Sequence, residues 1–142
     1  MTVKLFMDTW GWLTLRDKRE HRHEEIKELY LSLCNRKCLF YTTDYVLDET
    51  FTLLFRRLSF KEAMDSLDII DLAIKEGYLR LERITAERFE KAKGLRIKFR
   101  DKPRVSFTDL TSMVVMAERE ITDILTEEDH FTQVGMGFQK IP

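Results

Sequence analysis

The segment VKLFMD, residues 3–8, is an almost uninterrupted apolar run that stops at a carboxylate. A run with no polar face is typical of a strand that is buried on both sides of a parallel sheet. The carboxyl ends of parallel strands share one edge of the sheet, and ligands of open α/β sheets bind at that edge. The segment therefore predicts a parallel α/β fold with Asp8 at its ligand-binding edge.

The rest of the chain alternates strand-like and helix-like segments. We expect further strands at 39–42, 78–84, 121–125 and 138–141, because each is a short apolar or alternating run. Apolar residues at helical spacing predict helices at 20–34, 44–58, 59–77, 85–99 and 106–117. This alternation predicts a three-layer α/β/α sandwich with a mainly parallel central sheet.

The composition bounds the class of protein. The chain has 142 residues, 44% of them hydrophobic and 35% charged, so we expect one globular domain over 1–142. The start meets Asp8 too early for a signal peptide, and no apolar run approaches the roughly 20 residues of a membrane span. We therefore expect a cytoplasmic protein without a membrane partner. With a formal net charge of −1, binding of nucleic acid requires a local basic patch.

Acidic residues fall at four places on the same predicted edge of the sheet. They are Asp8, Glu49, Asp109 and the neighbouring pair Glu128 and Asp129. Carboxylates gathered at one point repel each other unless a cation neutralises them, and hard divalent ions such as Mg²⁺ or Mn²⁺ prefer oxygen ligands. Each acid has an ordinary explanation too; Asp109, three residues after Ser106, fits a capping box that only stabilises a helix start. Their common location nevertheless predicts a metal-dependent nuclease site.

Four segments resemble the motifs of PIN-domain ribonucleases, the family that includes VapC-type toxins. They are residues 5–9, 43–49, 106–116 and 124–131. The motifs are a hydrophobic strand ending in Asp and a hydroxyl residue, a Glu early in the helix after strand two, a capped helix opening with Asp, and a closing strand-Thr-x-acid-x-x-Phe signature. The register of the last motif puts Glu128 at the acidic position, where the family usually has Asp, and Asp129 is next to it.

The resemblance implies a metal-dependent endoribonuclease that is the toxin of a toxin–antitoxin pair. Asp8, Glu49 and Asp109 would hold one or two Mg²⁺ or Mn²⁺ ions, and Glu128 or Asp129 would complete the ring. A water activated by the metal would attack the RNA phosphodiester in line. The implied partners are RNA, a cognate antitoxin and a second copy of the chain in a homodimer.

Other side chains have expected supporting roles. Thr9 and Thr126 are expected to orient carboxylates or water, and His130 to be a loop or phosphate-contacting residue rather than a general base. Cys34 and Cys38 are expected to be reduced packing residues, because they lack the spacing of a zinc site. A dimer surface is expected where two consecutive helices meet, at Phe51, Phe55, Phe60 and Met64.

Residues 91–104 carry seven basic side chains and one acid, Asp101. The basic residues are Lys91, Lys93, Arg96, Lys98, Arg100, Lys102 and Arg104, and a smaller cluster consists of Arg16, Lys18, Arg19 and Arg22. We expect the long run to contact RNA phosphates because it directly precedes Asp109. The alternative is a solvated helix face.

Two other functional classes stay open from the sequence. A catalytically weak or inactive PIN fold that binds RNA or protein is supported by Glu at the fourth acidic position. A receiver-like signalling domain also gathers acids at a sheet edge. The sequence disfavours it, because the strand expected near 79–84 ends in Ile84 and Thr85 rather than a phosphoacceptor Asp.

Overall fold

A five-stranded parallel sheet forms the centre of the protein, in a computed structural model that describes residues 2–142. The strands are β1 (Lys4–Met7), β2 (Leu39–Thr43), β3 (Leu79–Glu82), β4 (Asp123–Leu125) and β5 (Gln139–Ile141). Their order is β3-β2-β1-β4-β5, and every pairing is parallel. The central strand, β1, buries Leu5, Phe6 and Met7, as expected for a strand covered on both faces.

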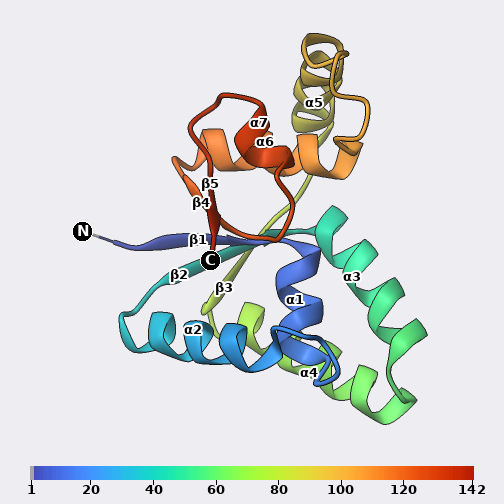
Figure 1. Ribbon diagram of the computed structural model, residues 1–142, viewed down its shortest axis with the longest axis vertical. Helices are drawn as coiled ribbons and strands as arrows, with labels where there is room; N and C mark the ends of the chain where they lie inside the picture. The colour runs from blue at the N-terminus through green and yellow to red at the C-terminus, as the bar shows by residue number, and fades with distance from the viewer. Residues whose placement is uncertain (1) are drawn as a thin grey trace.

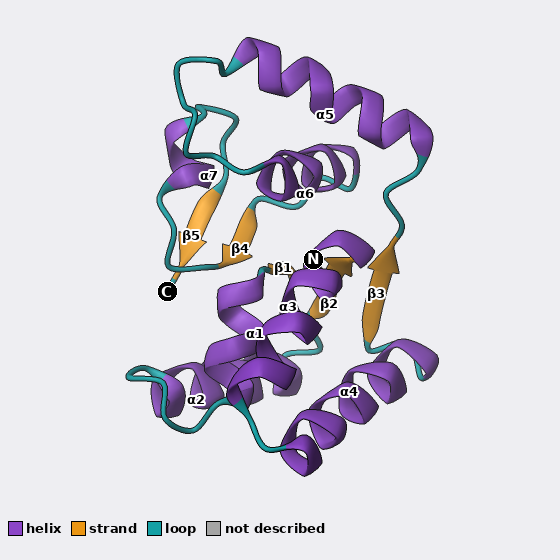
Figure 2. Cartoon of the chain, turned by 90° about the vertical axis from the view of Figure 1, so that its right-hand side faces the viewer, coloured by secondary structure: helices purple, strands orange, loops and turns teal. Residues whose placement is uncertain are grey.

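Helices cover both faces of this sheet. They are α1 (Thr9–Arg16), α2 (His23–Asn35), α3 (Asp44–Arg57), α4 (Phe60–Lys75), α5 (Ala86–Lys98), α6 (Phe107–Glu118) and α7 (His130–Gln133). Figure 1 shows α1 to α4 on one side of the sheet and α5 to α7 on the other, and Figure 2 shows the same division after a 90° turn. The predicted three-layer α/β/α sandwich is therefore confirmed. Within residues 2–142, no helix is both long and apolar enough to cross a membrane.

Hydroxyl side chains begin the helices at the positions that the sequence indicates. Thr43, Ser59, Thr85 and Ser106 each accept a hydrogen bond from the backbone N–H three residues ahead. Each bond satisfies one donor that a helix start otherwise leaves without a partner. These caps fix where α3 and α6 begin, and therefore where Glu49 and Asp109 emerge from the sheet edge.

Helix α1 was missing from the sequence-based prediction. Its eight residues contain Thr, Trp and Gly, which are weak helix formers, and its N-cap Asp8 makes no side-chain capping bond. Close packing onto β4 holds the helix in place. A Cβ on Gly11 would lie 3.0 Å from both the carbonyl oxygen and Cδ2 of Leu125, so only glycine allows this approach. The short helix α7 was also missed, and α2 begins at His23 rather than at residue 20.

Candidate active site

A cleft of about 500 Å³ opens where β1 and β4 end. Its charged lining consists of Asp8, Glu20, Glu49, Asp109, Glu127, Glu128, Arg57 and Arg104, together with His130. The cleft thus brings together one predicted acid from each of the four motifs. Six carboxylates face two arginines here, so the cleft carries a strong excess of negative charge.

Asp8 is the most deeply placed acid of the cleft, and its side chain is only 6% exposed. Its Oδ2 accepts a 2.9 Å hydrogen bond from Oγ1 of Thr126, at the end of β4. Burial, and then the nearby charges of Asp109 and Glu49, raise the pKa of Asp8 to about 7 against the opposing effect of the Thr126 bond. A carboxylate in this situation is stabilised by a bound cation.

Asp109 has two roles at once. It forms the predicted capping box with Ser106, in which the Ser106 N–H donates to Oδ2 of Asp109 (3.2 Å) and the Asp109 N–H donates to Oγ of Ser106 (3.0 Å). The same Oδ2 lies 3.0 Å from Nδ1 of His130. The capping box is therefore confirmed, and because it holds the carboxylate at the cleft, it is compatible with the predicted metal-binding role of Asp109.

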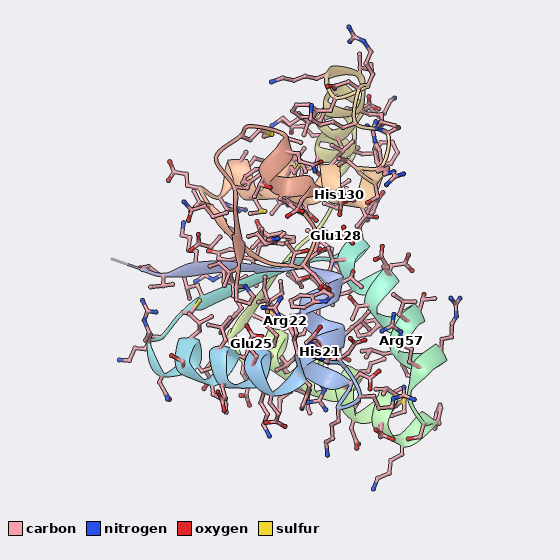
Figure 3. The ribbon with its side chains drawn as sticks, viewed as in Figure 1. His21, Arg22, Glu25, Arg57, Glu128 and His130 are labelled. Atoms are coloured by element: carbon pink, nitrogen blue, oxygen red, sulfur yellow. The ribbon has the colours of Figure 1, made fainter. Side chains whose placement is uncertain are left out.

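His130 links two acids of the cleft. Its Nε2 lies 3.7 Å from Oε2 of Glu128, while its Nδ1 contacts Asp109. Figure 3 shows the labelled side chains of His130 and Glu128 side by side above α1. His130 is the first residue of α7, and it contacts both acidic side chains.

Glu49 reaches the cleft from α3 as an exposed side chain. The helix beneath it is fixed by Thr50, whose hydroxyl donates to the Val46 carbonyl oxygen (2.7 Å). The Thr9 hydroxyl donates to the same carbonyl at 3.5 Å. Thr9 thus connects α1 to α3 and its hydroxyl does not hold a carboxylate, whereas Thr126 does hold one, as expected.

The structure separates the two candidates for the fourth acid. Glu128 lines the cleft, and its backbone N–H donates to Oγ1 of Thr126 (3.1 Å). Asp129 is exposed, does not line the cleft, and accepts a 2.7 Å hydrogen bond from Nζ of Lys140. This bond holds the pKa of Asp129 below its ordinary value. The geometry favours Glu128.

Most of the predicted basic patch lies away from the cleft. Among residues 91–104 only Arg104 lines it. The Arg96 guanidinium donates to the carbonyl oxygens of Phe99, Lys102 and Val105, so it stabilises the loop between α5 and α6. In the smaller cluster, Arg16 donates to Ser66 and Arg19 to Asp17. Arg96, Arg16 and Arg19 illustrate that basic side chains in a run can have structural partners.

The sequence analysis did not identify several residues of the cleft. Glu20 and Arg57 form an ion pair of 2.9 Å, and Glu127 and Trp10 complete the lining considered below. Glu20 reaches the cleft because α1 turns the chain back after Asp8, and no local pattern announces that turn. Glu127 directly precedes the acidic pair Glu128 and Asp129, but the sequence does not show that its side chain faces the cleft.

The donor set fits a hard divalent cation, although the side chains are not gathered as ligands. No group of three or more His, Cys, Asp or Glu residues that could hold a metal ion occurs within residues 2–142 as they stand. The available donors are all carboxylate oxygens, and small divalent ions retain several waters that can bridge to distant carboxylates. Burial is the main cause of the raised pKa of Asp8, and the nearby negative charges of Asp109 and Glu49 add to it. Cys34 and Cys38 are both free thiols; Cys38 is buried, as expected of a packing residue, whereas Cys34 is exposed.

Comparison with known proteins decides the family. No family model matches the chain. The 23S rRNA-specific endonuclease VapC20 of Mycobacterium tuberculosis is 30% identical over 131 residues, which cover 92% of this chain and 94% of that protein. The chain belongs to the VapC family of PIN-domain ribonucleases. Membership of this family shows that the receiver-like alternative is wrong.

Solved structures of VapC proteins share the fold. The crystal structure of M. tuberculosis VapC20, described as a Sarcin-Ricin loop cleaving toxin, matches with a TM-score of 0.77 over 92% of this chain and 95% of that one. VapBC2 from Rickettsia felis, bound to a promoter DNA fragment, matches at 14% identity with a TM-score of 0.71, covering 98% of each chain. DNA-bound VapBC from Salmonella typhimurium matches at 13% identity with a TM-score of 0.64, covering 99% of this chain and 98% of that one. The last two support the fold alone.

Proposed function

We propose that this VapC-family protein is the toxin of a toxin–antitoxin pair, and that it cleaves a structured ribosomal RNA with Mg²⁺ or Mn²⁺. The ion would be held by Asp8, Glu49, Asp109 and Glu128. The observation that carries the metal site is the cleft itself, in which the buried Asp8 carboxylate lies together with Glu49, Asp109 and Glu128. Burial, and then the charges of Asp109 and Glu49, raise the pKa of Asp8, which agrees with this geometry. Such a site is costly for a protein to maintain unless a cation binds there.

The four acids divide into an inner and an outer pair. Asp8 and Asp109 are both less than 10% exposed, and hydrogen bonds from Thr126 and Ser106 fix them, so they are suited to direct ligation. Glu49 and Glu128 are exposed at the rim and are suited to binding through water. A bound ion supplies an activated water for in-line attack and neutralises charge on the phosphate oxygens. Arg104, at the same cleft, is placed to contact an RNA phosphate.

The proposed substrate and partner rest on the relatives. VapC20, at 30% identity over 92% of this chain, is named as a 23S rRNA-specific endonuclease, and its crystal structure as a Sarcin-Ricin loop cleaving toxin. The R. felis and S. typhimurium proteins of the same fold are named as VapBC. We therefore propose a 23S rRNA loop as the substrate class and a VapB-type antitoxin as the partner.

A direct test is primer extension on 23S rRNA from ribosomes incubated with the purified protein. The reaction is run with Mg²⁺, with Mn²⁺ and with a chelator. The proposal predicts one dominant cleavage site with either ion and none with the chelator. Intact 23S rRNA under all three conditions, with other cellular RNAs cleaved, would contradict the substrate class. The absence of any RNA cleavage would instead support the inactive binding module.

A further inference from the structure

One wall of the catalytic cleft is apolar. Trp10, Leu13 and Leu53 line it beside the acids, and we call these three residues the apolar shelf. Trp10 and Leu13 lie three apart on α1, and Leu53 lies four residues after Glu49 on α3, so each pair lies on one side of its helix. Metal ions and phosphates bind polar and charged groups rather than apolar side chains. The shelf therefore suits an apolar part of the substrate.

Trp10 is the aromatic member of the shelf, and Arg22 contacts its ring. The guanidinium carbon of Arg22 lies 5.4 Å from the centroid of the Trp10 ring. Arg22 in turn donates hydrogen bonds of 2.9 and 2.7 Å to the two carboxylate oxygens of Glu25. Figure 3 shows Arg22 and Glu25 adjacent, below the labelled Glu128 and His130. This cation–π contact fixes the ring before substrate arrives, so little side-chain freedom is lost on binding.

Trp10 also lies close to Asp8 in the cleft. It is two residues after Asp8, so the two Cα atoms are at most about 7 Å apart. The half-buried ring lines the cleft in which the proposed metal ligands lie. A ring in this position would be within reach of a base beside a phosphate bound at Asp8.

We propose that an unpaired nucleobase next to the scissile phosphate stacks against Trp10 on the apolar shelf. The inference rests on the proposed function, since it assigns a base to the nucleotide being cleaved. A base in a duplex has neighbours on both faces, whereas the unstacked bases of RNA loops are free to stack on aromatic side chains. The shelf therefore selects substrates that present an unpaired nucleotide at the cleavage site, and Trp10 is a specificity-determining residue.

The test removes the base and the ring separately. The substrate is an RNA hairpin with the sarcin–ricin loop sequence, and one abasic nucleotide replaces each nucleotide around the cleavage site in turn. For the wild type, one abasic substitution beside the cut should lower kcat/KM between about 5-fold and 150-fold, the range that one base–aromatic stack supplies. For Trp10→Leu, that substitution should change kcat/KM by less than about two-fold, while Trp10→Phe should retain most of the discrimination.

The matched control is Tyr78→Leu, which removes an aromatic side chain that is 67% exposed just before β3, at the opposite edge of the sheet. This variant should discriminate as the wild type does. Equal discrimination by Trp10→Leu and the wild type would overturn the proposal. Equal cleavage of all abasic substrates by the wild type would also overturn it, without touching the proposed function.

Fluorescence gives a readout that needs no cleavage and no variant that fails to fold. The chain has two tryptophans, and Trp12 is only 4% exposed, in the core. Binding of the hairpin should quench the fluorescence of the wild type, and the Trp10→Phe variant should lose this quenching. Quenching that persists unchanged in Trp10→Phe, or binding without quenching in the wild type, would contradict stacking on Trp10.

Discussion

The Thr126 hydroxyl donates a 2.9 Å hydrogen bond to Oδ2 of Asp8, across 118 residues of sequence. The same hydroxyl accepts a bond from the backbone N–H of Glu128 at 3.1 Å. One side chain thus joins the end of β1 to the turn that carries the fourth acid. The relative positions of Asp8 and Glu128 depend on it.

Replacing Thr126 by Val should weaken metal binding. The variant removes the hydroxyl that donates to the Asp8 carboxylate and that accepts a hydrogen bond from the backbone N–H of Glu128. Loss of such a supporting partner typically costs about 10-fold to 100-fold in metal affinity or activity. Isothermal titration with Mn²⁺ measures the change, and Thr122→Val, at an exposed position just before β4, is the control. Unchanged Mn²⁺ affinity in Thr126→Val would show that the bond has no role in the site.

The stability of the metal-free protein should fall as the pH rises through the range in which Asp8 ionises. The carboxyl of Asp8 has an ordinary pKa of 3.8 in the unfolded chain and a pKa of about 7 in the folded protein. The folded state therefore binds more protons than the unfolded state between these values. The contribution of Asp8 to the free energy of unfolding decreases from about pH 4 to about pH 7 and is constant above.

Asp8→Asn should remove that part of the pH dependence. Urea unfolding in chelator at a series of pH values measures it for both proteins. Above pH 7 the variant should be at least as stable as the wild type, because it carries no buried charge beside Asp109. A variant that is markedly less stable at pH 8 would show that the Asp8 carboxylate is not strained in the folded protein.

Arg104 should contribute to RNA binding where its basic neighbours do not. Arg104 lines the cleft, while Arg100 lies in the same run and donates to the Ile97 carbonyl oxygen instead. Arg104→Gln should reduce the slope of log affinity against log salt by roughly 0.7, the value for one phosphate contact to a single strand. Arg100→Gln should leave the slope unchanged. If both substitutions changed the slope equally, the basic residues of 91–104 would act only through non-specific electrostatic attraction, and Arg104 would have no special role.

The protein is expected to form a homodimer through the junction of α3 and α4. Phe60 is 74% exposed and Phe55 is 37% exposed, with ring centroids 6.0 Å apart, so this predicted surface presents aromatic area to solvent. Phe51 and Met64, the other two residues of the predicted surface, are partly buried. Phe60→Asp should convert the dimer to the 17.0 kDa monomer in sedimentation experiments, whereas Leu31→Asp, on α2, should not. A wild-type monomer at tens of micromolar would refute the dimer.

The sequence was sufficient wherever structure follows from local pattern. The buried run before Asp8 gave the central strand, and hydroxyl caps at Thr43 and Ser106 gave the starts of the helices that carry Glu49 and Asp109. Strand ends and helix starts of a parallel sheet meet at one edge, so these acids were predictable as a group.

Local pattern failed where a contact joins distant parts of the chain. The choice between Glu128 and Asp129 depends on Lys140, which lies on the neighbouring strand β5 and pairs with Asp129 outside the cleft. Helix α1 forms because Gly11 packs onto Leu125, and it is this helix that brings Trp10 and Glu20 to the cleft. Lys98 and Lys102 were expected to contact RNA phosphates only because they belong to a basic run. Their ammonium groups lie over the Phe99 ring rather than in the cleft.

We propose that Asp8, Glu49, Asp109 and Glu128, and not Asp129, form the metal-dependent cleavage site. The most direct measurement is kcat for cleavage of one 23S rRNA hairpin at saturating Mn²⁺ by the wild type, Asp8→Asn, Glu128→Gln and Asp129→Asn. Loss of an inner ligand removes several kcal/mol of transition-state stabilisation, so Asp8→Asn should lower kcat by at least about 100-fold. Glu128→Gln should show a smaller but clear loss, and Asp129→Asn should stay within about two-fold of the wild type. Full activity of Asp8→Asn, or a larger loss in Asp129→Asn than in Glu128→Gln, would contradict this assignment of the metal-binding acids.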